Sequence, residues 1–450
     1  MDTLSIHPYQ TTLSEKLSES LTSPLPNGTP RRVYGAVHIG GKTTAVIGMR
    51  RAGKTMFLHQ IRRDRLAAGI DRERLPYINF EDERLAGLTA DYLHPLIEEY
   101  YRRFPALRSN ETVVWCFDEI QTVPGWERFV RRLLDSEKVE LFLSGSSAAL
   151  LSREIATALR GRAWEVVIHP FGFGEAMLDA GKKLPTQPDS LDGQSRSTLE
   201  RSFLDYLMAG GFPEAQGLDI ATRYQLLRDY VDVAILRDIV ERHSVGNVTG
   251  LRWLVRHLLG NAAGLFSVEK FYGAFKSQGL AISKDTVHQL MGYLQDCFLI
   301  RTIWMESSSE RQRMVNPRKA YPVDPGLIPV YDRTGRPNTG HALETAVYLE
   351  LERRRAEVSY VKTPKGFEVD FLARYPSGEE ELIQVCADVA ASNTADRELR
   401  SLIEAGRQFP RARKYLLTLT QDGLPREVPS DILAQPAYVW LLRSDGFESY

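Results

Sequence analysis

The run GMRRAGKT at residues 48–55 combines the residue types and the spacing of a phosphate-binding loop. It fits the pattern G-x-x-x-x-G-K-[ST], follows a β-branched run at 43–47 and precedes a helix-compatible stretch at 56–66. Gly48 and Gly53 have no Cβ, so backbone N–H groups can close around a β-phosphate. A helix that begins here adds the positive end of its dipole. The pattern therefore predicts a nucleotide site.

Two side chains of this loop are expected to contact different parts of a bound Mg²⁺–nucleotide. We expect Lys54 to place its charge on the β- and γ-phosphates, and Thr55 to offer a hydroxyl to Mg²⁺. A glycine-rich turn that merely begins a helix is the alternative, but both glycines, the lysine and the threonine fall in register. The residues predicted to surround the nucleotide are Gly48, Met49, Arg50, Arg51, Ala52, Gly53, Lys54, Thr55 and Met56.

A second motif, TVVWCFDE at 112–119, supplies the acidic half of a hydrolytic site. An apolar run that ends in Asp-Glu is typical of a buried parallel strand that emerges at the phosphates. We expect Asp118 to hold Mg²⁺ through its water shell and Glu119 to polarise the attacking water. The alternative is a buried strand that ends in a solvated acidic turn. Glu119 also argues against a small-molecule kinase, because a kinase has no water to activate.

Two further positions could complete the site. The apolar run 139–143 is followed by SGSS, and we favour Ser146, ahead of Ser144, as a contact to the γ-phosphate or the lytic water. A serine-capped turn is the alternative. Arg162, ahead of Arg160, could reach the γ-phosphate of a neighbouring subunit. A solvated cationic helix end is the alternative there.

At these residues the chain resembles the AAA+ superfamily. It is most similar to the prokaryotic predicted ATPases with an AAA+ core and a C-terminal nuclease-like domain of unknown function. The resemblance runs from about residue 35 to the C-terminus, and its motifs are GMRRAGKT, CFDEIQ, LSGSS, LRGR followed by HPFGFGE, and the lid phrase GGFPE. It implies an ATPase that uses ATP and Mg²⁺, and an architecture, but no pathway.

The elements that must position these residues alternate along the chain. Strand-like segments separated by helix-length segments predict an α/β fold with a parallel sheet covered on both faces. The strands are expected near 43–48, 75–80, 113–118, 139–144 and 163–168.

A chain of 450 residues exceeds what one hydrophobic core usually supports, so several domains are expected. The first residues form a flexible or lightly packed arm, and a helical pattern at 198–259 forms a lid. Within the lid, Arg237 could sense the γ-phosphate; a surface salt bridge to Asp238 or Glu241 is the alternative. The expected boundaries are 1–34 for the arm, 35–190 for the AAA+ P-loop core, 191–262 for the lid, 263–332 for a winged-helix-like module and 333–450 for a nuclease-like domain.

The winged-helix prediction depends on two helical patterns, a strand and a polar hairpin tip at 306–313. The first helix follows a serine cap, and Ser283 is the expected N-cap of the second. Such modules bind DNA or pack against protein, and both readings stay open. The residues that could face DNA are Lys284, His288 and Gln289, with Arg311 and Arg313 on the wing.

The C-terminal segment resembles the PD-(D/E)xK restriction-endonuclease-like α/β fold, in which carboxylates hold Mg²⁺ and a lysine steadies the nucleophilic water. Glu344 on a helix and Asp370 on a strand match its acidic positions. The E-x-K positions hold Gln384 and Cys386, so we expect a degenerate site without nuclease activity.

Other basic residues of the C-terminal segment could contact the nuclease-like site or a phosphate backbone. Lys362 or Lys365 could reach the nuclease-like site from an adjacent segment. A basic run could touch phosphates, although a solvated helix end explains it equally well; its members are Arg407, Arg411, Arg413 and Lys414.

Composition argues against a strongly basic nucleic-acid-binding protein, a zinc or disulfide framework and a membrane protein. The net charge of −1 provides no global attraction to nucleic acid. The three cysteines lie far apart without C-x-x-C spacing, which disfavours zinc and disulfides and suits a reducing cytosol. No stretch approaches the roughly 18 apolar residues of a membrane span, so we expect a cytoplasmic protein without membrane contact.

Together these features predict a Mg²⁺-dependent AAA+ ATPase whose nucleotide state switches or moves a winged-helix and nuclease-like half. The alternatives are an ATP-gated DNA endonuclease and an ATP-switched signalling or scaffold protein with slow turnover. DNA and a protein are the candidate partners, and a homo-oligomer is expected with nucleotide bound.

Overall fold

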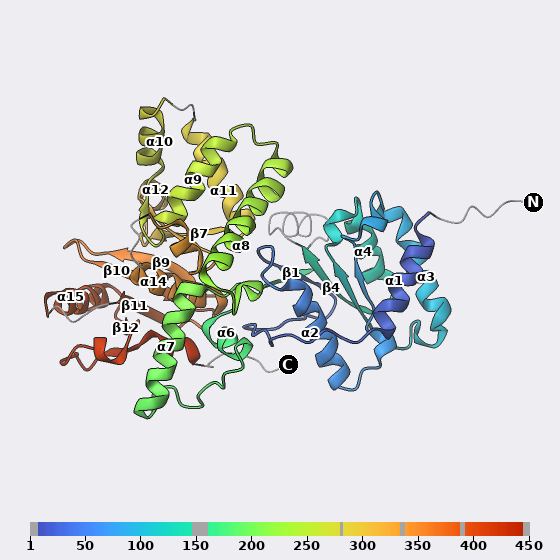
Figure 1. The fold of residues 1–450 in the computed structure, drawn as a ribbon, viewed down its shortest axis with the longest axis horizontal. Helices are drawn as coiled ribbons and strands as arrows, with labels where there is room; N and C mark the ends of the chain where they lie inside the picture. The colour runs from blue at the N-terminus through green and yellow to red at the C-terminus, as the bar shows by residue number, and fades with distance from the viewer. Residues whose placement is uncertain (1–7, 146–160, 280–281, 334–337, 388–391, 444–450) are drawn as a thin grey trace, which may run out of the picture. The chain divides into compact units, whose positions relative to one another are not determined.

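The computed structural model describes five stretches of the chain (Figure 1): 8–145, 161–279, 282–333, 338–387 and 392–443. The chain forms two compact units, the first reaching Ile168 and the second beginning at His169. This division falls within the segment 35–190 expected for the AAA+ core, and the segments predicted as lid, winged helix and nuclease-like domain share the second unit. Among the described residues, no helix has the length and apolar character required to cross a bilayer.

A five-stranded sheet forms the centre of the first unit, and its strands lie where the sequence predicts them. The order is β2-β3-β4-β1-β5, and every pairing is parallel. β1 and β3 are buried along their whole length and flank β4, so their carboxyl ends reach the same edge. The strands are β1 (Thr43–Ile47), β2 (Tyr77–Asn79), β3 (Val113–Asp118), β4 (Val139–Gly145) and β5 (Ala163–Val167).

The described α-helices of the first unit include one that the sequence analysis did not expect. They are α1 (Gln10–Thr22), α2 (Lys54–Ala67), α3 (His94–Arg103) and α4 (Trp126–Ser136). The expectation of a lightly packed arm is wrong for α1, because Leu13 and Leu17 are buried, at 2% and 0% exposure. Arg62 and Arg72 also donate to the Ser20 carbonyl, each at 2.6 Å. The i, i+4 leucine pair gives α1 an apolar side that packs onto the core.

The second unit is built on an eight-stranded sheet of order β13-β12-β11-β10-β9-β7-β8-β6. β7 pairs in parallel with β9, with Trp304 opposite Ser359. The hairpin of the predicted winged helix and the strands of the predicted nuclease-like domain therefore belong to one sheet. The strands are β6 (Leu265–Phe266), β7 (Ile300–Met305), β8 (Arg318–Pro322), β9 (Glu357–Lys362), β10 (Glu368–Arg374), β11 (Glu380–Cys386), β12 (Arg413–Thr418) and β13 (Ile432–Pro436).

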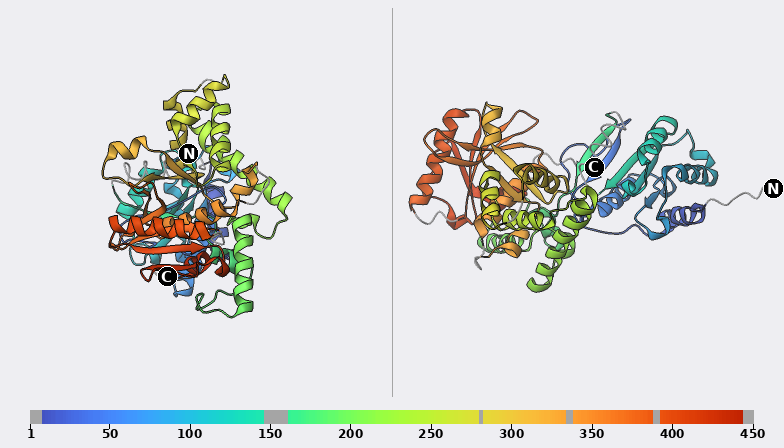
Figure 2. Two further views of the ribbon diagram at one scale, coloured as in Figure 1. Left: turned by 90° about the vertical axis from the view of Figure 1, so that its left-hand side faces the viewer. Right: turned by 90° about the horizontal axis from the view of Figure 1, so that it is seen from above.

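Helices cover both faces of this sheet. Phe371 and Ile383 pack in a core that includes residues of α14, whereas Leu372 and Leu382 pack with residues of α15. Neighbouring residues of a strand point to opposite faces, so α14 and α15 lie on opposite sides. Figure 2 shows α15, in orange-red, against one side of this sheet. The two helices are α14 (Thr339–Arg353) and α15 (Ser392–Gln408).

The other helices of the second unit include those predicted within 198–259 and after the two serine caps, together with several that were not predicted. Ser267 and Ser283 cap α10 and α11 as expected, because their hydroxyls accept the N–H of Lys270 and Thr286. The expected hairpin tip at 306–313 instead contains the short helix α12. These helices are α6 (Phe173–Asp179), α7 (Gly193–Ala209), α8 (Ile220–Val233), a π-helix (Ala234–Glu241), α9 (Val248–Gly260), α10 (Val268–Ser277), α11 (Lys284–Asp296), α12 (Glu310–Val315), α13 (Leu327–Tyr331) and α16 (Ala437–Leu442).

The GGFPE phrase joins two distant segments inside the second unit. The Gly211 N–H donates to Asp324 Oδ2 at 2.6 Å, and its carbonyl accepts from the Phe171 N–H at 2.6 Å. A Cβ at Gly211 would lie 2.0 Å from the Phe171 oxygen, so the approach requires glycine. Burial raises the pKa of Asp324 to about 7, although its two backbone hydrogen bonds act in the opposite direction. The phrase thus has a structural role in this unit.

Candidate functional site

The loop between β1 and α2 is shaped as a cradle that only glycine permits at its two ends. Gly48 and Gly53 have φ angles of 148° and 99°, in the region that disfavours residues with a Cβ. A Cβ at Gly48 would lie 2.2 Å from the Ile168 carbonyl oxygen. The glycine spacing therefore reflects both the backbone conformation and the close approach of the chain after β5.

Lys54, the first residue of α2, is held against the loop. Its Nζ donates to the carbonyls of Gly48 and Met49, each at 3.1 Å, and the residue is 5% exposed. Neutral carbonyls orient the ammonium without cancelling its charge. The lysine thus presents a cation on the cradle, where the sequence predicts contact with phosphates.

An arginine that the sequence analysis did not single out braces the loop. Arg31 donates from Nη1 to the Ala52 carbonyl at 2.7 Å, and it is 8% exposed. Its own backbone N–H and carbonyl pair with the Gln60 side chain on α2, at 2.7 and 3.1 Å. Arg31 precedes Gly48, the first residue of the loop, by 17 residues and lies outside the phosphate-loop pattern, so local spacing gave no signal for it.

Three hydroxyl groups converge on the buried carboxylate of Asp118. Oδ2 accepts from Thr55 Oγ1 at 2.8 Å and from Tyr77 Oη at 2.7 Å, and Oδ1 accepts from Ser144 Oγ. The structure thus brings together the two predicted magnesium ligands, Thr55 and Asp118. Ser144, the second choice for a phosphate contact, instead bonds to the carboxylate, and Ser146 lies outside the described residues.

The sequence analysis did not identify Tyr77 as a residue of this site, because a tyrosine at the start of a three-residue strand matches no motif. Burial, and then the charge of Asp118, raise the pKa of Tyr77, so the phenol stays a proton donor. Its ring lies 4.5 Å from the His59 ring. Burial, and then the charge of Arg62, lower the pKa of His59 to about 4, so this imidazole is neutral near pH 7.

Glu119 follows Asp118 in a left-handed backbone conformation, with φ 53° and ψ 40°. Its N–H donates to Ser144 Oγ at 3.1 Å, so one serine contacts both acidic residues. Gln121 donates to Oε2 of Glu119, and burial is the main cause that raises the pKa of the Glu119 carboxyl. Non-glycine residues rarely adopt this conformation without support from their surroundings, which the hydrogen bond to Ser144 supplies here.

The other predicted contacts of the nucleotide have different outcomes. Arg162 is exposed and forms a salt bridge with Asp135 on α4, and its predicted contact to a neighbouring subunit stays a prediction. Arg160 lies outside the described residues. Arg237 pairs with Glu241 at 3.3 Å, which is the surface salt bridge considered as the alternative.

In the second unit, Glu344 and Asp370 share a cation that comes from neither expected lysine. Lys319 on β8 donates to Glu344 Oε1 at 3.0 Å and to Asp370 Oδ1 at 2.8 Å. Lys365 pairs with Glu404 instead, and Lys362 is exposed. Among the residues that the structure describes, no group of three or more His, Cys, Asp or Glu side chains is arranged to hold a metal ion.

Several basic residues that could face DNA already have acidic partners. Lys284 lies 2.6 Å from Glu269, and Arg313 lies 3.2 Å from Glu310. In the C-terminal basic run the pairs are Arg407 with Glu404, Arg413 with Glu379 and Lys414 with Asp431. Local pairing reduces the positive potential that attracts a phosphate backbone.

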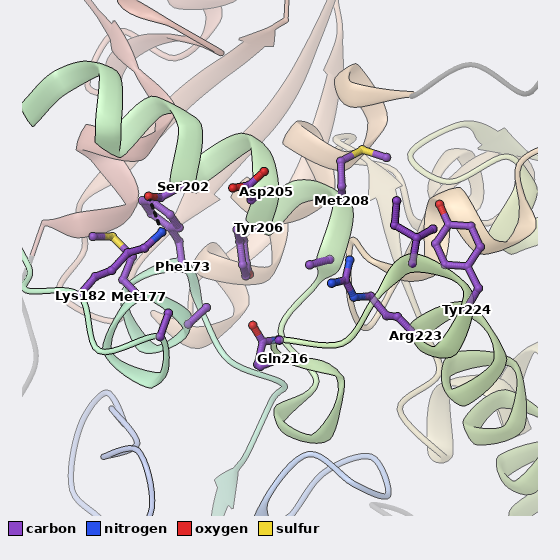
Figure 3. A pocket seen from close by; sticks show the side chains of 15 residues that line it. Phe173, Met177, Lys182, Ser202, Asp205, Tyr206, Met208, Gln216, Arg223 and Tyr224 are labelled. Atoms are coloured by element: carbon purple, nitrogen blue, oxygen red, sulfur yellow. Dashed lines mark hydrogen bonds between the residues drawn. The ribbon is translucent and has the colours of Figure 1, made fainter. Parts of the chain in front are cut away.

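A cavity of about 560 Å³ lies among α6, α7 and the start of α8 (Figure 3). Phe173, Met177 and Tyr206 contribute much of its lining, which is largely apolar. Lys182 bonds to Ser202 Oγ at 2.9 Å, and Arg223 donates to the Leu218 carbonyl at 2.5 Å. These cations are therefore engaged by the chain itself, and the cavity indicates no reaction.

Comparison with known proteins agrees with the loop geometry. A family model described as "AAA domain" matches residues 40–177, and a "Domain of unknown function (DUF8612)" matches 200–335. The chain is 34% identical over 416 residues to the uncharacterized protein MJ1544 of Methanocaldococcus jannaschii, covering 90% of this chain and 89% of that protein. It is 28% identical over 380 residues to an uncharacterized protein of Haemophilus influenzae, covering 84% and 91%.

Among solved structures, the Walker-type ATPase PABY2304 of Pyrococcus abyssi is similar over 72% of this chain and 95% of that one. The sequence identity is 16% and the TM-score is 0.37. Similarity at this level carries no argument about activity or partners, so the assignment depends on the AAA domain and on the loop itself.

Proposed function

Since this chain belongs to the same family as MJ1544 of Methanocaldococcus jannaschii and contains an AAA domain, we propose that it is a Mg²⁺-dependent ATP hydrolase. In this proposal the nucleotide state of the first unit switches or moves the second. The compartment we propose is the cytoplasm, and a homo-oligomer forms when nucleotide is bound.

One observation carries the proposal: the Thr55 hydroxyl, next to the lysine of the glycine-bounded loop, donates to the Asp118 carboxylate at 2.8 Å. Mg²⁺ in nucleotide sites is usually bound by one or two protein oxygen ligands, with waters and phosphates completing its shell. The residues present therefore fit Mg²⁺–ATP. When bound, the ion would neutralise charge that develops on the phosphates.

Each side chain then has a defined task. Lys54 binds the β- and γ-phosphates through an ammonium that is already oriented by two carbonyls. Glu119 accepts a proton from the attacking water, and the Gln121 amide, which donates to Oε2, helps to hold the carboxylate in place. The raised pKa of this buried carboxyl brings it closer to the operating pH, which suits a general base.

The proposal is tested by phosphate release from ATP by the purified full chain, with Mg²⁺ and with EDTA. Turnover should require Mg²⁺, and the mass in solution should rise with ATP. Absence of both turnover and nucleotide-dependent thermal stabilisation would refute an ATP site. A monomeric mass in ATP would refute only the oligomeric part.

The paired cations of the second unit favour a second candidate, an ATP-switched scaffold that binds a protein partner. Lys284, Arg407 and Arg413 each have a carboxylate partner, and the net charge is −1. Duplex DNA should then leave ATP turnover unchanged. A several-fold stimulation by DNA that disappears at high salt would favour the reading in which the chain acts on DNA.

Replacing Tyr77 by phenylalanine should weaken Mg²⁺-dependent turnover but not nucleotide binding. The change removes one of three donors to Asp118, and a hydrogen bond to a charged group contributes about 1.5–3 kcal/mol. We expect a higher Mg²⁺ concentration for half-maximal turnover and unchanged ATP affinity in EDTA. Tyr100→Phe is the matched control, because its hydroxyl donates to the Glu73 carbonyl at 2.9 Å. Equal Mg²⁺ curves for wild type and Tyr77→Phe would exclude a positioning role.

A further inference from the structure

Lys319 lies among three carboxylates with a side chain that is only 5% exposed. Its Nζ atom lies 2.8 Å from Asp370 Oδ1, 3.0 Å from Glu344 Oε1 and 3.1 Å from Glu368 Oε1. Tyr321 donates to the same Glu344 oxygen at 2.8 Å. β8, α14 and β10 therefore converge on one ammonium group.

The cluster has more negative than positive groups. Burial lowers the pKa of Lys319, but the charges of Asp370, Glu344 and Glu368 raise it, and it lies well above its ordinary value. Burial, and then Asp370, raise the pKa of Glu344. A buried carboxylate is costly unless a cation or hydrogen bonds compensate it. Lys319 therefore supplies the positive charge that compensates these carboxylates, and Tyr321 adds a hydrogen bond to Glu344.

The Gln384 amide and the second oxygen of Asp370 already form hydrogen bonds within the chain. Gln384 accepts the Asp370 N–H at 3.3 Å and donates to Glu398 Oε2 at 2.7 Å. Asp370 Oδ2 accepts the Val385 N–H at 3.0 Å, which leaves Oδ1 for Lys319. Cys386 is buried. A metal ion would have to displace these internal contacts as well as the ammonium.

We propose that Lys319 is the built-in cation of this cluster, and that it occupies the place a divalent metal ion would take among these carboxylates. Mg²⁺ and Ca²⁺ lie about 2.0–2.6 Å from their oxygen ligands, so an ion would need the volume that Nζ fills. The ammonium and a metal ion therefore exclude each other. The cluster ties β8 to α14 and β10 without metal, independently of the ATPase proposal.

Lys319→Met tests this proposal, because it removes the ammonium and keeps an unbranched stem. All proteins also carry Asp118→Asn, so that the nucleotide site contributes no ion. Bound Mn²⁺ is counted by electron paramagnetic resonance in the absence of ATP. We expect no bound ion with Lys319 present, and about one per chain with Lys319→Met, where the three carboxylates face an open site. Mn²⁺ should also raise the melting temperature of that variant alone.

Lys365→Met is the matched control, since it removes an exposed lysine paired with Glu404 in the same unit. It should bind no Mn²⁺. If Lys319→Met does not fold, Lys319→Met with Glu368→Gln has less uncompensated charge and keeps two carboxylates for the ion. A folded variant that binds no Mn²⁺ would overturn the proposal. So would an ion bound with Lys319 present that is lost in Asp370→Asn, because the cluster would then be a metal site.

Discussion

Lys54→Ala should abolish ATP binding. Lys54 presents the ammonium that we propose contacts the β- and γ-phosphates, and its Nζ is already oriented by the carbonyls of Gly48 and Met49. A ligand at one hundred times its dissociation constant stabilises the native state by about 2.7 kcal/mol. Wild type should therefore show a rise in melting temperature with ATP that the variant lacks.

The control for this experiment is Lys138→Ala, which removes an exposed lysine of the same unit that donates to the Asn110 carbonyl. It should retain the full ATP-dependent shift. Equal shifts in wild type and Lys54→Ala would contradict the assignment of the loop. Loss of the shift in both lysine variants would indicate a general effect of charge on nucleotide binding.

Glu119→Gln should retain ATP binding and nearly stop hydrolysis. The amide is almost isosteric but cannot accept the proton of the attacking water, and general-base catalysis typically contributes 10²–10⁴-fold to a rate. A single-turnover assay with pre-bound ATP measures this step directly. Glu111→Gln, which alters an exposed carboxylate near Arg74, should hydrolyse ATP at the wild-type rate. Unchanged cleavage by Glu119→Gln would place the base elsewhere.

We also predict that the single-turnover rate of the wild type depends on pH, whereas that of Glu119→Gln does not. Because burial raises the pKa of Glu119, this carboxyl binds its proton at a higher pH than an ordinary glutamate. The wild-type single-turnover rate should therefore fall as the pH is lowered through that raised pKa, since the protonated acid cannot act as a base. The residual rate of Glu119→Gln should stay flat over the same range. A parallel decline in both proteins would assign the titration to another group.

The parallel sheet and the nucleotide loop could be predicted because their signals are local. Apolar runs bounded by turns identify the five strands of the first unit, and glycine, lysine and threonine spacing identifies the loop. The α1 helix was missed because its apolar side rests on Leu13 and Leu17, within a segment rich in serine and threonine. Two leucines give too weak a periodic signal.

The residues that support the site could not be read from local patterns. Tyr77 reaches Asp118 across 41 positions of sequence, and Lys319 reaches Asp370 across 51. The prediction of a missing cation in the nuclease-like site used the spacing of Gln384 and Cys386 on one strand. Lys319 supplies an ammonium to Glu344 and Asp370 from a different strand, so only the fold reveals it.

The pairing of β7 with β9 determines which parts of this protein can be inherited or exchanged separately. A piece that begins near residue 333 would lose β8, and with it the ammonium that Glu344 and Asp370 share. It would also expose β9 as an unpaired edge, which invites aggregation. Gene fusion or recombination at that point would therefore break a folding unit, although the sequence motifs place a domain boundary there. We therefore expect the segment from β6 to β13 to be inherited as one unit.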